Sequence, residues 1–202
     1  TSNLSLDATA VGTRTLTLQG STAGTGEFAG VIANAGASAN LAVAKSGGGT
    51  WVLSGANTHT GGTIVNAGTL VANNSTGSAT GGGSIVVHSG AILSGTGSMN
   101  AGTNAITLNG TLAIGDTTLG SALRTDLELR TTGGSGITLG STGIMQFDLF
   151  SGAGAGNNTA SLTASDLLIL YGDFSVLSGA SLLINNPHNM SAWAIGDQWR
   201  RW

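Results

Sequence analysis

Short clusters of Val, Ile, Leu and Thr alternate with Gly, Asn and Ser along most of the chain. Where apolar and polar residues alternate inside a cluster, the pattern predicts a strand buried on one face, and where apolar residues run together it predicts a strand buried on both. Helices are hard to place, because Thr, Val and Ile favour strands and Gly, Asn or Ser bounds nearly every cluster. The expected strands are 14–19, 40–45, 50–53, 63–66, 69–72, 84–88, 105–109, 143–150, 166–171 and 180–185.

Two short motifs recur along the chain. The strand start Gly-Thr-Leu or Gly-Ala-Ile-Leu begins at Gly68, Gly90 and Gly110, so successive copies lie 22 and 20 residues apart. That spacing fits one coil of three short strands and three turns, and it leaves too few residues for helical crossovers. The prediction is an all-β fold, a right-handed parallel β-helix (β-solenoid) with about 20–22 residues per coil. A Leu-Ser-Gly motif, expected as a turn, recurs at 53–55, 93–95 and 177–179.

The coils are expected to run through two parts of the chain. Residues 1–150 are predicted to form β-solenoid repeats, and residues 151–202 to continue the coils. The Gly/Ala/Asn/Thr run at 152–164 lacks apolar periodicity and predicts a loop excursion, and the Trp-rich end at 192–202 predicts a hairpin or a partial cap. Because the chain starts without a methionine and ends inside an apparent strand, it reads as a piece of a longer exported protein.

Composition narrows the class of protein. Only 7% of the 202 residues are charged and 35 are glycine, yet 40% are apolar, so the chain is expected to be ordered around a core. A formal net charge of −3 without a run of like charges lacks the footprint of a nucleic-acid or anionic-membrane binder. The absence of Cys excludes disulfides and thiolate metal sites. No apolar run approaches the roughly 20 residues of a membrane-spanning helix.

No catalytic, cofactor or metal site is predicted. The histidines His59, His88 and His188 are scattered and are expected as solvated turn or strand residues. Lys45, the only lysine, precedes a Gly run instead of following it, so the Gly runs are expected as solenoid corners and not as phosphate loops. The chain has no Gly-x-Ser-x-Gly, no His-Glu-x-x-His and no calcium-binding Gly-Gly-x-Gly-x-Asp motif.

Carboxylates are the other candidates, because β-helix enzymes that cleave acidic polysaccharides gather acids and bases on one face. Asp126 and Glu128 share one face of a predicted strand with Arg124 and Arg130. Such a stripe of alternating charge favours a solvated, salt-bridged face over a catalytic pair. The candidate acids are Asp116, Asp126, Glu128, Asp148, Asp166 and Asp173.

Two segments, SGGGTWVLSGANTHTGGTIVNAGTL at 46–70 and GAILSGTGSM at 90–99, resemble the autotransporter-associated β-strand repeat, also called the passenger-associated transport repeat. The segment GEFAGVI at 26–32 looks like the one that commonly precedes it. The resemblance implies a β-helical passenger of a secreted or cell-surface protein, in which the repeat assists export and folding, and it implies no catalytic residue. His59 stands where the family usually has an aromatic residue. The motif positions are Gly49, Thr50, Trp51, Leu53, Gly55, Asn57, Thr60, Gly61, Gly62, Thr63, Gly68 and Leu70.

The chain is therefore predicted to be a non-catalytic structural or adhesive module of an exported bacterial surface or extracellular fibre protein, outside the cell or on its outer membrane. Its expected partners are other copies, through unpaired strand edges at both ends, and surface glycans. The alternative is a polysaccharide-binding or polysaccharide-cleaving β-helix protein. Trp193, Trp199 and Trp202 are the candidates for a glycan-stacking platform, although burial or capping is the favoured interpretation.

Overall fold

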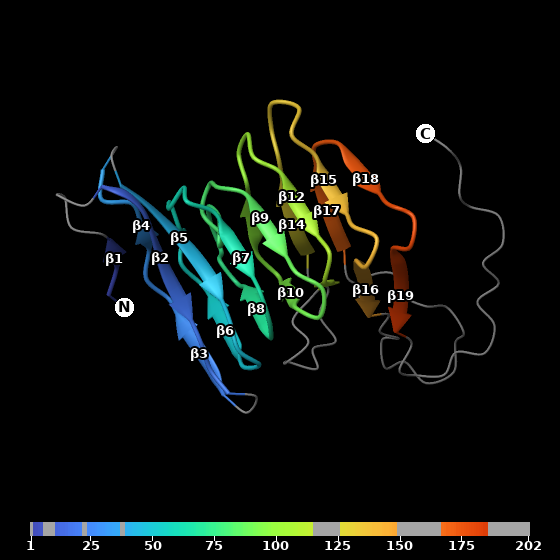
Figure 1. Ribbon diagram of the computed structural model, residues 1–202, viewed down its shortest axis with the longest axis horizontal. Helices are drawn as coiled ribbons and strands as arrows, with labels where there is room; N and C mark the ends of the chain where they lie inside the picture. The colour runs from blue at the N-terminus through green and yellow to red at the C-terminus, as the bar shows by residue number, and fades with distance from the viewer. Residues whose placement is uncertain are drawn as a thin grey trace.

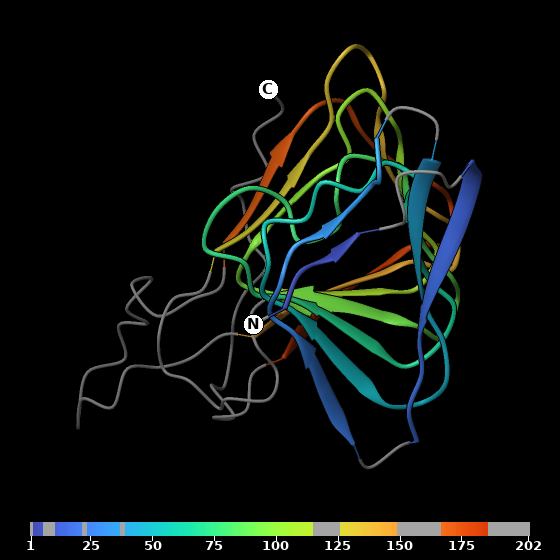
Figure 2. The same ribbon diagram turned by 90° about the vertical axis from the view of Figure 1, so that its left-hand side faces the viewer.

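The computed structural model describes residues 2–5, 11–21, 24–36, 39–114, 126–148 and 167–185. Within these residues every strand pair is parallel, and neither a helix nor a segment suited to cross a membrane as a helix occurs. Successive strands stack along one axis, so the chain winds as a parallel β-solenoid, as the sequence predicted (Figure 1). Viewed along that axis, the strands of successive coils lie over one another and fan out, because neighbouring strands twist relative to each other (Figure 2).

Two seven-stranded sheets form two faces of the solenoid, and each coil contributes one strand to each of them. The first sheet contains β2 (Gly12–Leu18), β5 (Ala39–Lys45), β7 (Thr63–Val65), β9 (Ile85–Val87), β12 (Ile106–Leu108), β15 (Ile137–Leu139) and β18 (Phe174–Val176). The second sheet contains β3 (Thr25–Phe28), β6 (Thr50–Leu53), β8 (Thr69–Ala72), β10 (Ile92–Gly95), β13 (Thr111–Ile114), β16 (Ile144–Asp148) and β19 (Ser181–Asn185).

The third face is partly sheet and partly irregular. In the two coils between its sheets the chain closes without a strand, yet backbone bonds still link the coils: Thr58 N donates to Ile32 O at 2.9 Å, and Ala79 N donates to Ser98 O at 2.9 Å. The hydrogen-bonded stack is therefore continuous on this face too. Its strands are β1 (Leu4–Ser5) paired with β4 (Ile32–Ala33), and β11 (Ser98–Asn100), β14 (Asp126–Arg130) and β17 (Leu167–Tyr171) in one sheet.

Coil length follows from the register of the first sheet. The three central coils measure 20, 22 and 21 residues (Val43 to Thr63, Thr63 to Ile85, Ile85 to Ile106), which confirms the predicted 20–22. The first and last coils are longer than predicted. They measure 27 residues from Gly12 to Ala39, 31 from Ile106 to Ile137, and 37 from Ile137 to Phe174. The last two intervals include 115–125 and 149–166, so the predicted loop excursion at 152–164 lies outside the described residues.

Of the two recurring motifs, only the strand start marks equivalent positions. Leu93 lies opposite Leu70 on one side and Leu112 on the other, so the three leucines form one column. The Leu-Ser-Gly motif is not a repeated turn, because 93–95 lies inside β10 whereas 177–179 follows β18. A chain this rich in Gly and Ser contains short Gly/Ser motifs by chance. A buried leucine recurs at equivalent positions because it packs against the leucine of the next coil.

The core is a set of aliphatic columns that run along the axis. In β7, β9, β12 and β15 the two end residues are buried and the middle one faces outward. Each inward side chain packs against the same position of the coils before and after it, and full burial of one such side chain contributes about 1.5–3 kcal/mol. One column, in register order, is Leu18, Lys45, Val65, Val87, Leu108, Leu139 and Val176.

Candidate functional site

The outer face of the third sheet carries the charged stripe that the sequence singled out. In β14 the two leucines are buried, and Asp126, Glu128 and Arg130 alternate with them on the outer face, as their spacing predicted. Arg124 lies outside the described residues. The register extends these positions into two columns, which are Ser98, Glu128 and Ile169, and Asn100, Arg130 and Tyr171.

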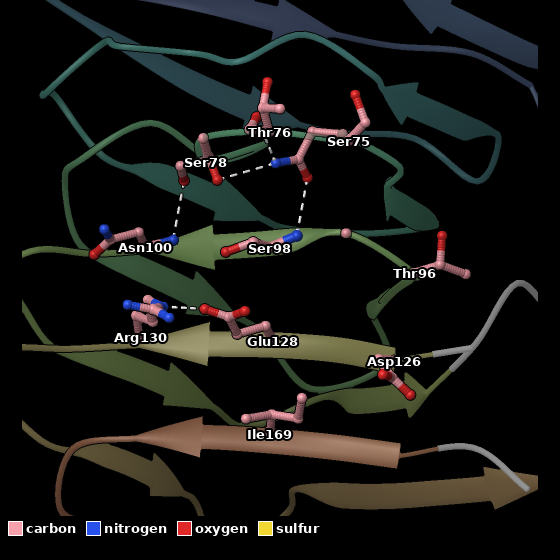
Figure 3. Close-up of a pocket in the computed structure, with 13 residues that line it drawn as sticks. Ser75, Thr76, Ser78, Thr96, Ser98, Asn100, Asp126, Glu128, Arg130 and Ile169 are labelled. Atoms are coloured by element: carbon pink, nitrogen blue, oxygen red, sulfur yellow. Dashed lines mark hydrogen bonds and ion pairs between the residues drawn. The ribbon is translucent and has the colours of Figure 1, made fainter. Parts of the chain in front are cut away.

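A groove of about 600 Å³ lies along these columns, and segment 74–78 forms its opposite wall (Figure 3). A second hollow of about 260 Å³ adjoins it, because Ser78 and Asn100 line both. We call the two together the polar groove, since its side chains are mostly hydroxyls, amides and charged groups. The lining residues are Asn57, Thr58, Asn74, Ser75, Thr76, Gly77, Ser78, Gly81, Gly82, Thr96, Gly97, Ser98, Asn100, Gly102, Asp126, Glu128, Arg130 and Ile169.

Arg130 is held in place from two sides. Its Nε donates to Oε1 of Glu128 in an ion pair, and its guanidinium carbon lies 4.0 Å from the centroid of the Tyr171 ring in the next coil. The hydrogen bond and charge of Glu128, with a smaller contribution from Tyr171, raise the pKa of Arg130, so it is a permanent cation. The side chain therefore presents its remaining N–H donors in a defined position.

The opposite wall is fixed by its own hydrogen bonds. Asn74 accepts a bond from Ser98 N at 3.0 Å and donates to the carbonyls of Thr76 and Gly77, both at 3.1 Å. Ser78 Oγ donates to Gly81 O at 2.7 Å and accepts from Asn100 N at 2.9 Å. These two side chains connect successive coils and set the shape of the groove.

The repeat region buries four polar side chains that the sequence did not identify as buried: Lys45, Asn57, His59 and Thr63. His59 is 0% exposed, which overturns the expectation that it is solvated; His88 is exposed as expected, and His188 lies outside the described residues. The irregular segment after β6 turns inward at His59, whose ring lies against the backbone of Gly81 in the next coil. A hydrophobicity pattern misses this because segment 55–60 has no strand periodicity.

A chain of hydrogen bonds sets the tautomer of His59. Thr63 Oγ1 donates its only proton to Thr80 O at 2.9 Å, so the contact of 3.1 Å between His59 Nε2 and Thr63 Oγ1 needs the proton on Nε2. Within the described residues Nδ1 is buried without a hydrogen-bond partner. Burial is the main influence and lowers the pKa of His59, and the backbone of Ile32 acts in the opposite direction. A second proton would leave a charge inside the solenoid.

Lys45 is also 0% exposed, although its column is otherwise aliphatic. Its Nζ donates to three backbone carbonyls, those of Ser46 at 3.0 Å, Gly47 at 2.7 Å and Ala67 at 2.9 Å. The three N–H groups of an ammonium match these acceptors one for one, although burial lowers the pKa of Lys45. Lys45 thus links two consecutive coils at the corner and leaves nothing for an external ligand.

Asn57, a further buried polar side chain, bridges three coils. Its Oδ1 accepts from Ile32 N at 2.8 Å in the preceding coil, and its Nδ2 donates to Ala79 O at 2.5 Å in the following one. It replaces the strand pairing that this part of the third face lacks.

The remaining motif residues also connect coils. Trp51 lies opposite Gly26, where a Cβ would come within 2.8 Å of the indole, and its Nε1 donates to Gln19 O at 3.0 Å. Gly68, at φ 68°, has no room for a Cβ beside the carbonyl oxygens of Gly47 and Gly49. Thr50 and Leu53 belong to β6, Thr63 to β7 and Leu70 to β8. The segment between β6 and β7 contains Gly55, Thr60, Gly61 and Gly62.

The structure describes only two of the other predicted candidates. Asp173 is exposed next to β18, Asp148 ends β16, and Asp116, Asp166, Trp193, Trp199 and Trp202 lie outside the described residues. Within the described part of the chain no group of three or more His, Cys, Asp or Glu side chains is placed to hold a metal ion.

Comparison with known protein families gives a match over part of the chain. Residues 43–72, from β5 to β8, match the passenger-associated-transport-repeat model, which confirms the resemblance drawn from the sequence. This repeat indicates export or a cell-surface location. No curated protein and no solved structure gives a significant match. The matched segment contains Lys45 and Asn57, so buried polar side chains of the repeat take part in linking the coils.

Proposed function

We propose that this chain is a non-catalytic structural module of an exported bacterial surface or extracellular fibre protein, and that it acts as a rod. The observation that carries this proposal is the stacking of seven coils in two unbroken parallel sheets, with the passenger-associated repeat inside them. Lys45 and Asn57 of the repeat form side-chain hydrogen bonds with neighbouring coils. Such a solenoid resists local unfolding because each coil is held from both sides.

A scaffold role is favoured over catalysis by the arrangement of the acids. Asp126 and Glu128 alternate along one strand, so their Cα atoms are about 7 Å apart. Glycoside cleavage needs one carboxyl group as acid and a second facing the same sugar carbon. Glu128 is instead bound to Arg130 beside it, in an arrangement suited to binding.

We expect copies of the chain to associate head to tail. In the described part of the chain, β18 and β19 pair on one side only at one end, as β2 and β3 do at the other. The end coil exposes Val176 by 57% and Leu182 by 52%. Because all strands run in one direction, the first coil of a second copy continues both sheets with the same polarity and covers these side chains.

Light scattering of the chain over a range of concentrations tests the assembly. Growth of multimers with concentration is expected, and Val176→Lys combined with Leu182→Lys should abolish it, because lysine charges cannot be buried at the junction. Ile64→Lys is the matched control, since Ile64 is 39% exposed on β7 in the middle of the rod. A chain that stays monomeric at the highest soluble concentration would remove the assembly proposal.

Activity assays test the absence of catalysis. The chain is expected to release no product from a panel of neutral and acidic polysaccharides. Hydrolysis that disappears in Asp126→Asn or Glu128→Gln would show that the groove is an active site and would replace the scaffold proposal.

A further inference from the structure

The polar groove runs along the solenoid axis and not around one coil. Its lining extends from Asn57, after β6, through Ser78 and Asn100 to Glu128 and Ile169, so five successive coils contribute to it. With coils about 4.8 Å apart, the larger hollow, to which four of these coils contribute, is about 14 Å long. A depression of this length along a rod suits an extended chain better than a compact small molecule.

The chemistry of the lining selects the kind of chain. Ser75, Thr76 and Ser98 present hydroxyl groups, Glu128 presents carboxylate oxygens and Arg130 presents N–H donors. A ligand hydroxyl both donates and accepts hydrogen bonds, so it can bind to the acceptors and to the donors that lie next to each other in this lining. Bonds to the ionised Glu128 and Arg130 are the strongest of these.

Charge disfavours the other polymers. Within the described lining, Asp126 and Glu128 place two carboxylates beside the cation of Arg130. These carboxylates disfavour a polyphosphate, a nucleic acid or a uronate polymer. A peptide strand would need an unpaired sheet edge, whereas this surface is the face of a sheet in which β14 is paired on both sides.

The groove is formed before any ligand arrives. Arg130 is held between Glu128 and the Tyr171 ring, and the facing wall is held by Asn74 and Ser78. Little side-chain freedom is then lost on binding, which favours measurable affinity for a weakly interacting ligand. Ile169 supplies an apolar contact for the C–H face that a sugar ring presents beside its hydroxyls.

We propose that the polar groove binds an uncharged, hydroxyl-rich linear polymer, that is, a neutral polysaccharide. This activity goes beyond the scaffold role and does not depend on assembly, because a single copy contains the whole groove. It would attach the rod laterally to a glycan while the two ends remain available for other copies.

The test is a titration of the whole chain with maltohexaose, cellohexaose and mannohexaose, with oligogalacturonate as the anionic probe, followed by NMR or calorimetry. We expect at least one neutral probe to bind and oligogalacturonate to bind at least tenfold more weakly. Arg130→Gln should weaken binding of the neutral probe about tenfold, and Ser75→Trp should block the groove by bulk from an exposed loop position. Thr107→Val, on the outer side of β12 in the first sheet, is the matched control.

Each result decides the proposal. No binding of any neutral probe at millimolar concentration overturns it, and so does preferential binding of oligogalacturonate. Binding that Arg130→Gln and Ser75→Trp leave unchanged places the site elsewhere and overturns it as well. Circular dichroism of each variant shows that the fold is intact, and light scattering on the same samples reports separately on the scaffold proposal.

Discussion

The central coils and the last coil follow the same ladder but differ in burial. Leu139 of β15 is 4% exposed, whereas Val176, directly opposite it in β18, is 57% exposed. Likewise Ile137 is 0% exposed and its partner Phe174 is 39% exposed. In each pair the two side chains are apolar and occupy the same column of the stack. What differs is that, among the described strands, β15 is paired on both sides and β18 on one side only, so a coil in this architecture is buried by its neighbours and not by its own sequence.

The largest expected effect tests that comparison within one column. Leu93 and Leu182 occupy the same column through Leu112 and Met145. Leu93→Ala should lower the free energy of unfolding by about 2–5 kcal/mol, because it opens a cavity in a fully buried site. Leu182→Ala, at 52% exposure, should cost less than about 1 kcal/mol. Urea unfolding measures both. Equal losses would mean that the last coil is covered as well as the central ones.

The second largest expected loss of stability concerns Lys45, a buried polar side chain of the central coils. Lys45→Met keeps the aliphatic stem in its column but removes the donors to Ser46, Gly47 and Ala67. We expect the free energy of unfolding to fall by about 1–3 kcal/mol, because buried carbonyls lose their partners. Arg14→Met is the control, since Arg14 is exposed on β2. If the Met variant unfolds at the same urea concentration as the parent, the hydrogen bonds of Lys45 do not stabilise the fold.

The smallest effect is a dependence on pH. Burial lowers the folded-state pKa of His59 below the ordinary value of 6.5. Between the two values the unfolded chain binds a proton that the folded chain does not, so the free energy of unfolding falls as pH drops below 6.5 and is level above it. The loss is about 1.4 kcal/mol for each pH unit that separates the two pKa values.

His59→Phe should remove this dependence, because an aromatic ring fills the site without a titrating group. Urea unfolding at several pH values between neutral and mildly acidic conditions measures it, and His88→Phe, at an exposed position, is the matched control. If the loss of free energy of unfolding at acidic pH persists in His59→Phe and disappears in His88→Phe, His59 is not the group responsible for it.

Strand positions were predictable where Gly, Asn or Ser bounds an apolar cluster. The strands β6 and β8 have the predicted bounds, 50–53 and 69–72. The strand β3 was not expected, because TGEF has no apolar alternation, and it forms by pairing with β6. In the candidate site, the shared face of Asp126, Glu128 and Arg130 was predictable from the period of two residues. The contact of Arg130 with Tyr171 was not, since it depends on a coil much longer than the central period.

The local pattern of residues therefore determined the all-β class, the parallel solenoid, the central coil length and the repeat family. The alternation of apolar residues, the turn residues and their spacing can be seen in the sequence itself, without knowing which coils pack together. The tertiary structure alone decided which side chains are buried and which hydrogen bonds they make. His59, Lys45 and Val176 show the reason: burial depends on which residue of the next coil lies against each position, and that is set by the length of the coil between them.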